Sequence, residues 1–267
     1  VSIKYENKEI KKHKDFVDKF INLLQKVERF VLKKADLVST ISYGMINKLK
    51  TKTSTETYYL TNWIDVGKFS NPKLETHKYL STASFKILYS GNIGAKQDWV
   101  FFIEFLNQLK EIDNVEVIVV GEGAEKENLL QKIKNYTFVK HYNLVPYDEL
   151  PSLLSGADLH ILFQKTDVID TVMPSKILGM MASAKPSIVT GNLKSEVATV
   201  FKDSEGGFYF DGKSIEHIIN KIILLKGNKK MCLELGENAK AYVEEKYSKD
   251  KVLNKFINQL NNLCYEK

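Results

Sequence analysis

The chain has 267 residues, of which 43% are hydrophobic and 27% are charged, and its formal net charge is +6. This composition supports a folded core, and no apolar run is long enough to span a membrane. Arg29 is the only arginine, so bidentate guanidinium contacts to base edges are almost unavailable. The other basic residues are scattered lysines, which argues against a nucleic-acid partner.

The cysteines and the first residues of the chain indicate the cellular compartment to expect. Cys232 and Cys264 lie in polar, helical contexts without metal-ligand spacing, which predicts reduced thiols. The chain starts at Val1 with charged turns that do not resemble a signal peptide. We therefore expect a cytoplasmic protein.

The first predicted element is an amphipathic helix over residues 15–34. Its apolar face, opposite the lysines, comprises Phe16, Phe20, Leu24, Val27 and Val31. Such a face packs into a core in most proteins. With flanking lysines it also suits a peripheral contact with an anionic inner membrane, and both interpretations stay open.

Two short strands come next, over residues 37–41 and 58–61. They flank a helix over 43–50, which Ser42 is suited to cap. Neither strand has its usual sheet neighbours in the chain, so we expect exposed strand edges. Residues 63–84, which include Ser, Thr and Pro in an irregular pattern, are interpreted as a linker.

From residue 85 onward, strands and helices alternate. The predicted strands are 85–90, 115–120, 136–142, 158–163, 186–190 and 207–210. The predicted helices are 96–111, 124–134, 147–155, 174–184, 193–201, 213–226, 229–246 and 249–263. Continuous apolar runs such as VEVIVV are typical of parallel strands buried on both faces. The pattern predicts an α/β fold with a Rossmann-like, doubly wound parallel sheet, whose ligands lie at the carboxyl ends of the strands.

Glycines mark two of these strand ends. Gly91 and Gly94 follow the strand 85–90, and Gly123 follows the strand 115–120. Glycine lets the backbone approach a ligand closely, although it also serves in plain turns. The spacing fits neither the dinucleotide-binding fingerprint nor a P-loop. The two loops therefore point to a ligand without specifying a nicotinamide cofactor.

The helix over 174–184 is the main candidate for an anion site. Pro174 suits the first helical position, because its φ is fixed and its missing N–H would have no partner there. Ser175 and Lys176 then lie in the first turn, where N–H groups and the helix dipole favour an anion. We interpret this helix as a receptor for phosphate, against the alternative of an ordinary helix with a surface lysine.

Several segments together resemble the nucleotide-binding half of a GT-B glycosyltransferase of the retaining family 4. They are ADLVSTIS (35–42), LTNWIDVGKF (60–69), ILYSGNIGAKQ (87–97), VIVVGEGAEKENL (117–129), LPSLLSGADLHILFQ (150–164) and VMPSKILGMMASAKPSIVT (172–190). The resemblance covers nearly the whole chain from residue 28. It is greatest to bacterial enzymes of capsule and O-antigen synthesis.

The resemblance implies a domain organisation. Residues 1–62 correspond to the end of the acceptor-side domain, 85–248 to the nucleotide-sugar-binding domain, and 249–267 to a helix that crosses back. Most of the acceptor-side domain has no counterpart in the chain. We therefore expect this polypeptide to bind nucleotide but to transfer sugar poorly or not at all.

The resemblance also implies the diphosphate contacts. The backbone at Gly91 is expected to lie against the diphosphate, and Ser175 and Lys176 match a Pro-Ser-Lys variant whose helix N-terminus holds it. Asn92 stands where arginine is common, and Lys96 is close to the usual lysine. Lys176 and Lys96 are thus the predicted catalytic residues.

The remaining donor contacts depart from the common pattern. The loop ending at Leu144 is expected to border the base, and Glu196 to lie near the sugar. The two glutamates of many members, the second of which contacts the ribose, align with Thr171 and Gly179. Asp170 is a candidate substitute for the first.

The implied reaction transfers a sugar from a nucleoside-diphosphate sugar to a glycan or lipid-linked acceptor, with retention. No metal or other cofactor is expected, since the five histidines are isolated. Two alternative functions stay open: a GT-B nucleotide-sugar epimerase, and a nucleotide-binding module without catalysis. A nicotinamide-dependent oxidoreductase is disfavoured by the absence of the fingerprint.

Overall fold

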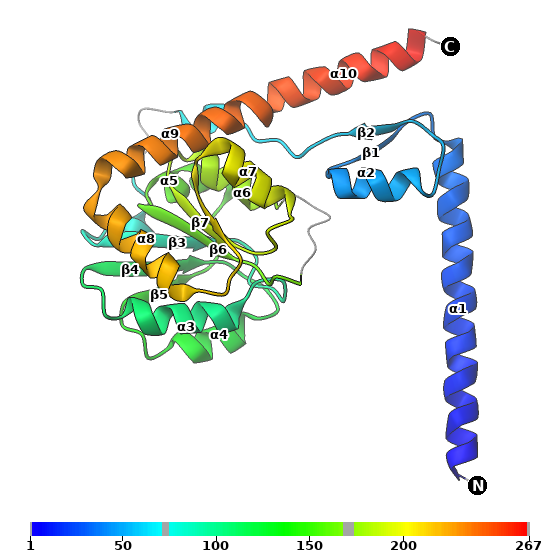
Figure 1. The fold of residues 1–267 in the computed structure, drawn as a ribbon, viewed down its shortest axis with the longest axis horizontal. Coiled ribbons are helices and arrows are strands. Elements are labelled where there is room, and N and C mark those ends of the chain that lie inside the picture. Colours follow the sequence, from blue (N-terminus) through cyan, green and yellow to red (C-terminus); the bar gives the residue numbers. More distant parts are fainter. Residues whose placement is uncertain (1, 71–74, 168–173, 266–267) are drawn as a thin grey trace.

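A computed structural model describes residues 2–70, 75–167 and 174–265 of the chain. Its largest part is a six-stranded parallel sheet (Figure 1). The strands are β3 (Phe85–Ser90), β4 (Val115–Val120), β5 (Val139–Tyr142), β6 (Leu159–Phe163), β7 (Ser187–Thr190) and β8 (Gly207–Phe210). Their order is β5-β4-β3-β6-β7-β8. The sheet is therefore doubly wound, with the order reversing between β3 and β6, and the predicted fold class is confirmed.

Both faces of the central strands are buried. Ile87 and Val117 belong to a large core on one face, whereas Leu88 and Ile118 belong to a smaller core with Leu153 on the other. Successive residues of a strand point to opposite faces, so a strand covered on both sides is apolar throughout. This is the physical basis of the continuous apolar runs in the sequence.

Helices cover the sheet on both sides, with α3 and α4 on one side and α5 and α6 on the other (Figure 1). Their bounds are α3 Trp99–Leu109, α4 Lys126–Ile133, α5 Leu150–Ser155, α6 Ser175–Ala182, α7 Glu196–Ser204, α8 Ile215–Gly227, α9 Lys229–Lys246 and α10 Lys249–Tyr265. The number and order of the predicted elements are confirmed in this part of the chain.

Some predicted boundaries are wrong by a few residues. α6 begins at Ser175, because Pro174 has extended backbone (ψ 121°) and is the residue before the first turn. α3 begins at Trp99, three residues later than predicted, because the Asp98 side chain accepts a hydrogen bond from Phe101 N–H and caps the helix. Capping, which depends on side-chain geometry, thus sets the start.

The N-terminal part consists of α1 (Ser2–Lys34), β1 (Val38–Thr40), α2 (Tyr43–Lys50) and β2 (Thr57–Tyr59). β1 and β2 pair with each other in parallel, so each has one sheet neighbour. Ser42 caps α2 as predicted, with its Oγ accepting a hydrogen bond from Met45 N–H at 3.1 Å.

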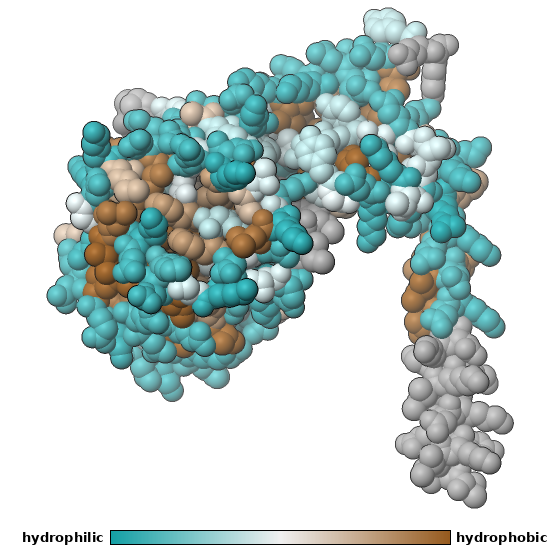
Figure 2. Space-filling view, viewed as in Figure 1, coloured by the Kyte–Doolittle hydropathy of each residue, from teal (hydrophilic) through white to brown (hydrophobic). Residues whose placement is uncertain are grey.

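The apolar face of α1 is exposed. Phe16, Phe20 and Phe30 keep 69%, 53% and 63% of their surface accessible, and Figure 2 shows apolar residues along one side of this helix. In the described part of the chain, none of the helices combines the length and apolarity that crossing a bilayer requires.

The segment predicted as a linker packs on the large sheet domain. It contains two short 3-10 helices, Val66–Phe69 and Lys78–Leu80, and the Leu80 side chain is buried in the smaller core. α10 extends from the large domain towards β2 (Figure 1), where Phe256 contacts Tyr58 with ring centroids 5.5 Å apart. The N-terminal part is thus connected to the large sheet domain twice, through the segment that follows β2 and through α10.

Candidate donor-binding site

A cavity of about 410 Å³ opens at the carboxyl end of the sheet. It is bounded by residues that follow β3 and β5, by the start of α6, and by the segment after β2. The lining residues are Trp63, Ile64, Ser90, Gly91, Val120, Leu144, Val145, Tyr147, Leu150, Leu154, Ser175, Lys176 and Gly179. Of the predicted site residues, Gly91, Leu144, Ser175 and Lys176 meet here.

Gly91 directly follows β3, at the point where the strand order reverses. Its φ is +136°, a backbone conformation that side-chain-bearing residues rarely adopt. A Cβ atom built at Gly91 would lie 2.9 Å from Nζ of Lys176. Glycine therefore permits both the backbone turn and the close approach of the lysine. The predicted contact of this loop with a ligand stays a prediction.

Lys176 extends from the first turn of α6 over the end of β3. Its Nζ donates a hydrogen bond to the Tyr89 hydroxyl at 3.0 Å and lies 4.7 Å from the centre of that ring. The hydroxyl in turn donates to the carbonyl oxygen of Asn92 at 2.6 Å. Burial lowers the pKa of Lys176 to about 8 and raises the pKa of Tyr89. The ammonium is thus held in place and partly stripped of water.

The start of α6 adds backbone donors to this cation. Its first turn contains no acidic residue, and Ser175 is exposed at the cavity. The first N–H groups of a helix have no carbonyl partner within the helix and carry partial positive charge. Together, the helix start, Lys176 and the Gly91 backbone form an end of the cavity that suits a diphosphate.

Asn92, Gly94 and Gly123 are brought together, but outside the set that lines the cavity. A Cβ built at Gly94 would lie 2.5 Å from Asn92 Nδ2, and one built at Gly123 would lie 2.6 Å from Asn92 Oδ1. Gly123 must lack a side chain, because its Cβ would also lie 2.3 Å from the Ile93 carbonyl oxygen and its φ is +154°. The Asn92 amide therefore packs between the two glycine loops. Their predicted contact with the ligand stays a prediction.

Lys96 is exposed and is not among the described residues that line the cavity. Its neighbour Gln97 is buried, and the Gln97 side chain accepts a hydrogen bond from Gly94 N–H at 3.0 Å. Trp99 donates from Nε1 to the Gly94 carbonyl oxygen at the same distance. The structural support of the glycine loop thus comes from Gln97 and Trp99, which the sequence analysis did not single out.

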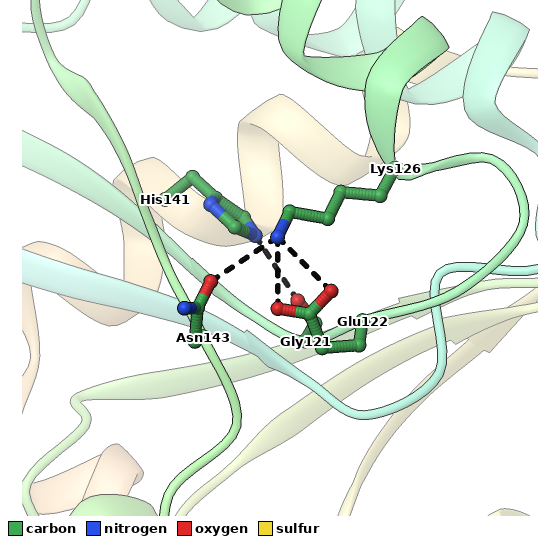
Figure 3. Close-up of polar contacts among 5 residues, drawn as sticks. All are labelled: Gly121, Glu122, Lys126, His141 and Asn143. Carbon is green, nitrogen blue, oxygen red and sulfur yellow. Dashed lines mark hydrogen bonds and ion pairs between the residues drawn. The ribbon is translucent and has the colours of Figure 1, made fainter.

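The loop after β5 is tied to the loop after β4 (Figure 3). Lys126 donates to both carboxylate oxygens of Glu122, at 2.8 and 3.0 Å, and to the Asn143 side chain at 3.2 Å. His141 Nε2 lies 3.1 Å from the Gly121 carbonyl oxygen. These contacts hold the segment that carries Leu144 at the edge of the cavity.

The predicted ribose and sugar contacts have different outcomes. Asp170 and Thr171 lie outside the described residues. Gly179 lines the cavity, and a Cβ there would lie 3.1 Å from Leu154 Cδ1. The Glu196 carboxylate accepts a hydrogen bond from Tyr43 N–H at the start of α2. Its role near the sugar stays a prediction.

Several residues that line or shape the site were not predicted from the sequence, and Tyr89 and Trp63 are two examples. Tyr89 looked like one more apolar strand residue, and Trp63 belonged to a segment interpreted as a linker. Within the described ranges, three or more His, Cys, Asp or Glu side chains do not gather in a group that could hold a metal ion. Metal-independent chemistry remains an expectation from the sequence.

The chain is similar to known proteins in sequence and in fold. Residues 74–242 match the family described as glycosyl transferases group 1. A putative colanic acid biosynthesis glycosyl transferase, WcaI of Escherichia coli strain K12, is 29% identical over 255 residues. The alignment covers 91% of this chain and 61% of WcaI. The chain therefore spans about three-fifths of this relative's length.

Two further similarities concern a second relative and the fold. N-acetyl-alpha-D-glucosaminyl L-malate synthase of Bacillus anthracis is 22% identical over 244 residues, covering 87% of this chain and 61% of that protein. The crystal structure of Anabaena HepE with UDP and glucose matches with a TM-score of 0.72 and 16% identity, covering 89% of this chain and 66% of HepE. The fold is that of the GT-B glycosyltransferases.

The family match extends over more than half of the chain and includes every strand of the large sheet, Gly91 and the start of α6. The chain belongs to the glycosyl transferases group 1 family.

Proposed function

We propose that this chain binds the donor of a retaining glycosyltransferase, a nucleoside-diphosphate sugar. The observation that carries the proposal is the ammonium of Lys176, partly buried beside Gly91 at the start of α6. A cation and the start of a helix, with its partial positive charge, in one apolar-walled cavity suit a diphosphate joined to a nucleoside. The UDP bound in the HepE structure supports this ligand class.

The proposed chemistry follows from the negative charge that develops on the diphosphate as the sugar leaves it. The bond between the anomeric carbon and the diphosphate oxygen breaks, and its electron pair stays on the leaving diphosphate. An acceptor hydroxyl forms the new glycosidic bond on the same face and passes its proton to the leaving diphosphate oxygen. Preorganised positive groups aimed at the leaving oxygen lower the barrier, and Lys176 with the start of α6 would supply them.

The acceptor is proposed to be a glycan or a lipid-linked glycan of a bacterial surface polysaccharide. Support comes from the relatives: WcaI is described by colanic acid biosynthesis, and another relative is a poly(ribitol-phosphate) alpha-N-acetylglucosaminyltransferase of Staphylococcus aureus. Cytoplasmic location belongs to the same proposal, in keeping with two free cysteines.

Calorimetric titration of the purified chain with UDP, GDP and NAD tests the ligand class. We expect UDP or GDP to bind and NAD not to bind. Binding of NAD without UDP or GDP would overturn the proposal, because the site would then recognise a dinucleotide.

We extend the proposal to a peripheral membrane contact through α1, whose exposed apolar face lies among more basic than acidic residues. The chain should sediment with vesicles containing anionic lipid, and the double variant Phe20→Glu, Leu24→Glu should not. If the unmodified chain stays in the supernatant, this part of the proposal is wrong.

A further inference from the structure

The donor cavity has two ends of different chemistry. Ser90, Gly91, Ser175 and Lys176 form a polar, cationic end. Apart from Gly179, the rest of the wall is aliphatic or aromatic: Trp63, Ile64, Val120, Leu144, Val145, Tyr147, Leu150 and Leu154. Among the described lining residues there is no carboxylate or carboxamide to hydrogen-bond a ribose or a base. A ligand that extends from the cationic end must therefore be held largely by contact with these apolar side chains.

Trp63 has the largest side chain of this apolar wall, and 44% of its surface is exposed. The other tryptophan, Trp99, is buried and hydrogen-bonded to the glycine loop. An exposed indole next to a cavity is a flat apolar surface that a planar or ring-shaped ligand can cover. Trp63, unlike Trp99, thus presents an indole surface to the cavity that no buried packing accounts for.

The backbone next to Trp63 is anchored. The next residue, Ile64, donates from its N–H to the Tyr247 carbonyl oxygen at 3.0 Å, and its own carbonyl oxygen accepts from Lys249 N–H at 2.9 Å. These bonds fasten the segment to the junction of α9 and α10. An aromatic side chain on an anchored segment loses little conformational entropy when a ligand binds.

Gly179 brings the apolar wall close to α6. A Cβ there would lie 3.1 Å from Leu154 Cδ1, a tight contact, and 4.0 Å from Ile64 Cδ1. The absence of a side chain thus lets Leu154 and the segment of Ile64 pack against α6, three residues after Lys176. The wall that contains Trp63 therefore lies against the helix that begins at the cationic end of the cavity.

We propose that Trp63 is a platform for the nucleoside of the bound donor and determines how tightly that nucleoside is held. The inference rests on the proposed function, since it takes the diphosphate to lie at Lys176 and the start of α6. Stacking on an aromatic side chain tolerates different bases, because each base has a π-face. Trp63 therefore supplies affinity for the nucleoside without selecting the base.

The test compares a nucleotide with its phosphate part alone. Calorimetry with UDP and with inorganic pyrophosphate is carried out on the unmodified chain, Trp63→Ala, Trp63→Phe and the control Tyr265→Ala, a 90% exposed aromatic of α10. Trp63→Ala should weaken UDP binding roughly 5- to 150-fold. Pyrophosphate binding should stay unchanged, and Trp63→Phe should recover part of the UDP affinity. Tyr265→Ala should leave both affinities unchanged.

The outcomes separate the two proposals. If the unmodified chain binds neither UDP nor GDP, the proposed function itself fails. If it binds UDP and Trp63→Ala binds UDP equally well, only the platform is wrong. Equal loss of UDP and pyrophosphate affinity in Trp63→Ala would also overturn the platform, because it would show general damage to the site.

Fluorescence gives a second readout that does not depend on the alanine variant. The chain has two tryptophans, so a change of emission on adding UDP, under excitation that is selective for tryptophan, reports on Trp63 or Trp99. We expect Trp63→Phe to abolish most of this change while its far-ultraviolet circular dichroism stays that of the unmodified chain. An undiminished change in Trp63→Phe would contradict the inference.

Discussion

At the scale of a single residue, Lys176 must be both charged and partly buried. Its ammonium must be charged to hold a diphosphate, yet burial lowers its pKa to about 8. The Tyr89 hydroxyl and ring face partly replace the lost water. The structure thus keeps a cation poised at the cavity at a cost to the folded state, which the anion relieves when it binds.

Replacing Lys176 should weaken nucleotide binding selectively. A hydrogen bond to a charged group contributes about 1.5–3 kcal/mol, so Lys176→Met should raise the Kd for UDP roughly 10- to 150-fold near pH 7. Calorimetry measures the change. The control Lys132→Met alters an exposed lysine of α4 and should leave the Kd unchanged. Equal affinities of the unmodified chain and Lys176→Met would contradict the assigned role.

The same lysine predicts a pH dependence. Above about pH 8 the unliganded side chain loses its proton, so UDP affinity should fall in the unmodified chain and change less in Lys176→Met. The free energy of unfolding should instead rise as the pH is raised. Between pH 8 and the ordinary lysine value of 10.5, the unfolded chain binds more protons, so this residue's contribution to the unfolding free energy rises with pH. Titrations and urea denaturation at pH 7, 8 and 9 check both signs.

Gly91→Ala tests the backbone beside that cation. The substitution places a Cβ 2.9 Å from Lys176 Nζ and puts alanine at a φ of +136°, a strain of about 1–3 kcal/mol. We expect a lower midpoint of urea denaturation and loss of UDP binding. Gly227→Ala is the matched control, because a Cβ there meets nothing within 4 Å. Normal UDP affinity in Gly91→Ala would show that the close approach is unimportant.

At the scale of elements, α7 and α2 meet through a carboxylate at a helix start. Glu196 accepts from Tyr43 N–H, and its pKa is raised by burial despite the backbone N–H groups of Tyr43 and Gly44, which lower it. An acidic side chain at a helix N-terminus is favourable. This contact links the large sheet domain to the β1-α2-β2 unit, in addition to the contact between α10 and β2.

Removal of that carboxylate should loosen α2 locally. In Glu196→Ala, amide hydrogen exchange at Tyr43 and Gly44 should become roughly 2- to 12-fold faster. This factor corresponds to the net free energy that one hydrogen bond contributes to stability. Amides of the central strand β4 should exchange as before. Glu234→Ala, an exposed acidic residue of α9, serves as the control. Unchanged exchange at Tyr43 would mean that the contact adds no stability.

At the scale of the whole molecule, binding and transfer need different surfaces. The described chain contains the donor cavity, and it spans 61% of the length of WcaI. Transfer also requires an acceptor hydroxyl held in line with the anomeric carbon, and positioning of this kind contributes several orders of magnitude to rate. We propose that this chain lacks most of the surface that positions the acceptor.

The purified chain should therefore bind nucleotide without transferring sugar above the uncatalysed background. Calorimetry measures the first property, and release of UDP from UDP-sugar in the presence of a glycan acceptor measures the second. Transfer at a rate typical of a complete enzyme would show that the acceptor site is already present in these residues.

Much of the fold could be predicted from local patterns. Apolar runs of strand length alternating with helical segments determined the doubly wound sheet, because strands buried on both faces must be apolar throughout. Ser42 as the cap of α2, and Ser175 with Lys176 at the start of α6, follow from contacts within one helical turn. Such features depend on neighbours a few residues away, so the sequence contains them directly.

The pairings within the site were decided by the tertiary structure alone. Tyr89 and Lys176 are 87 positions apart and meet only because β3 and α6 end at the same edge of the sheet. Lys96 was chosen for its charge, whereas Gln97 is the residue whose side chain turns inward. Which way a side chain points, and what lies opposite it, depends on the packing of distant elements, and residue types in sequence order do not record that.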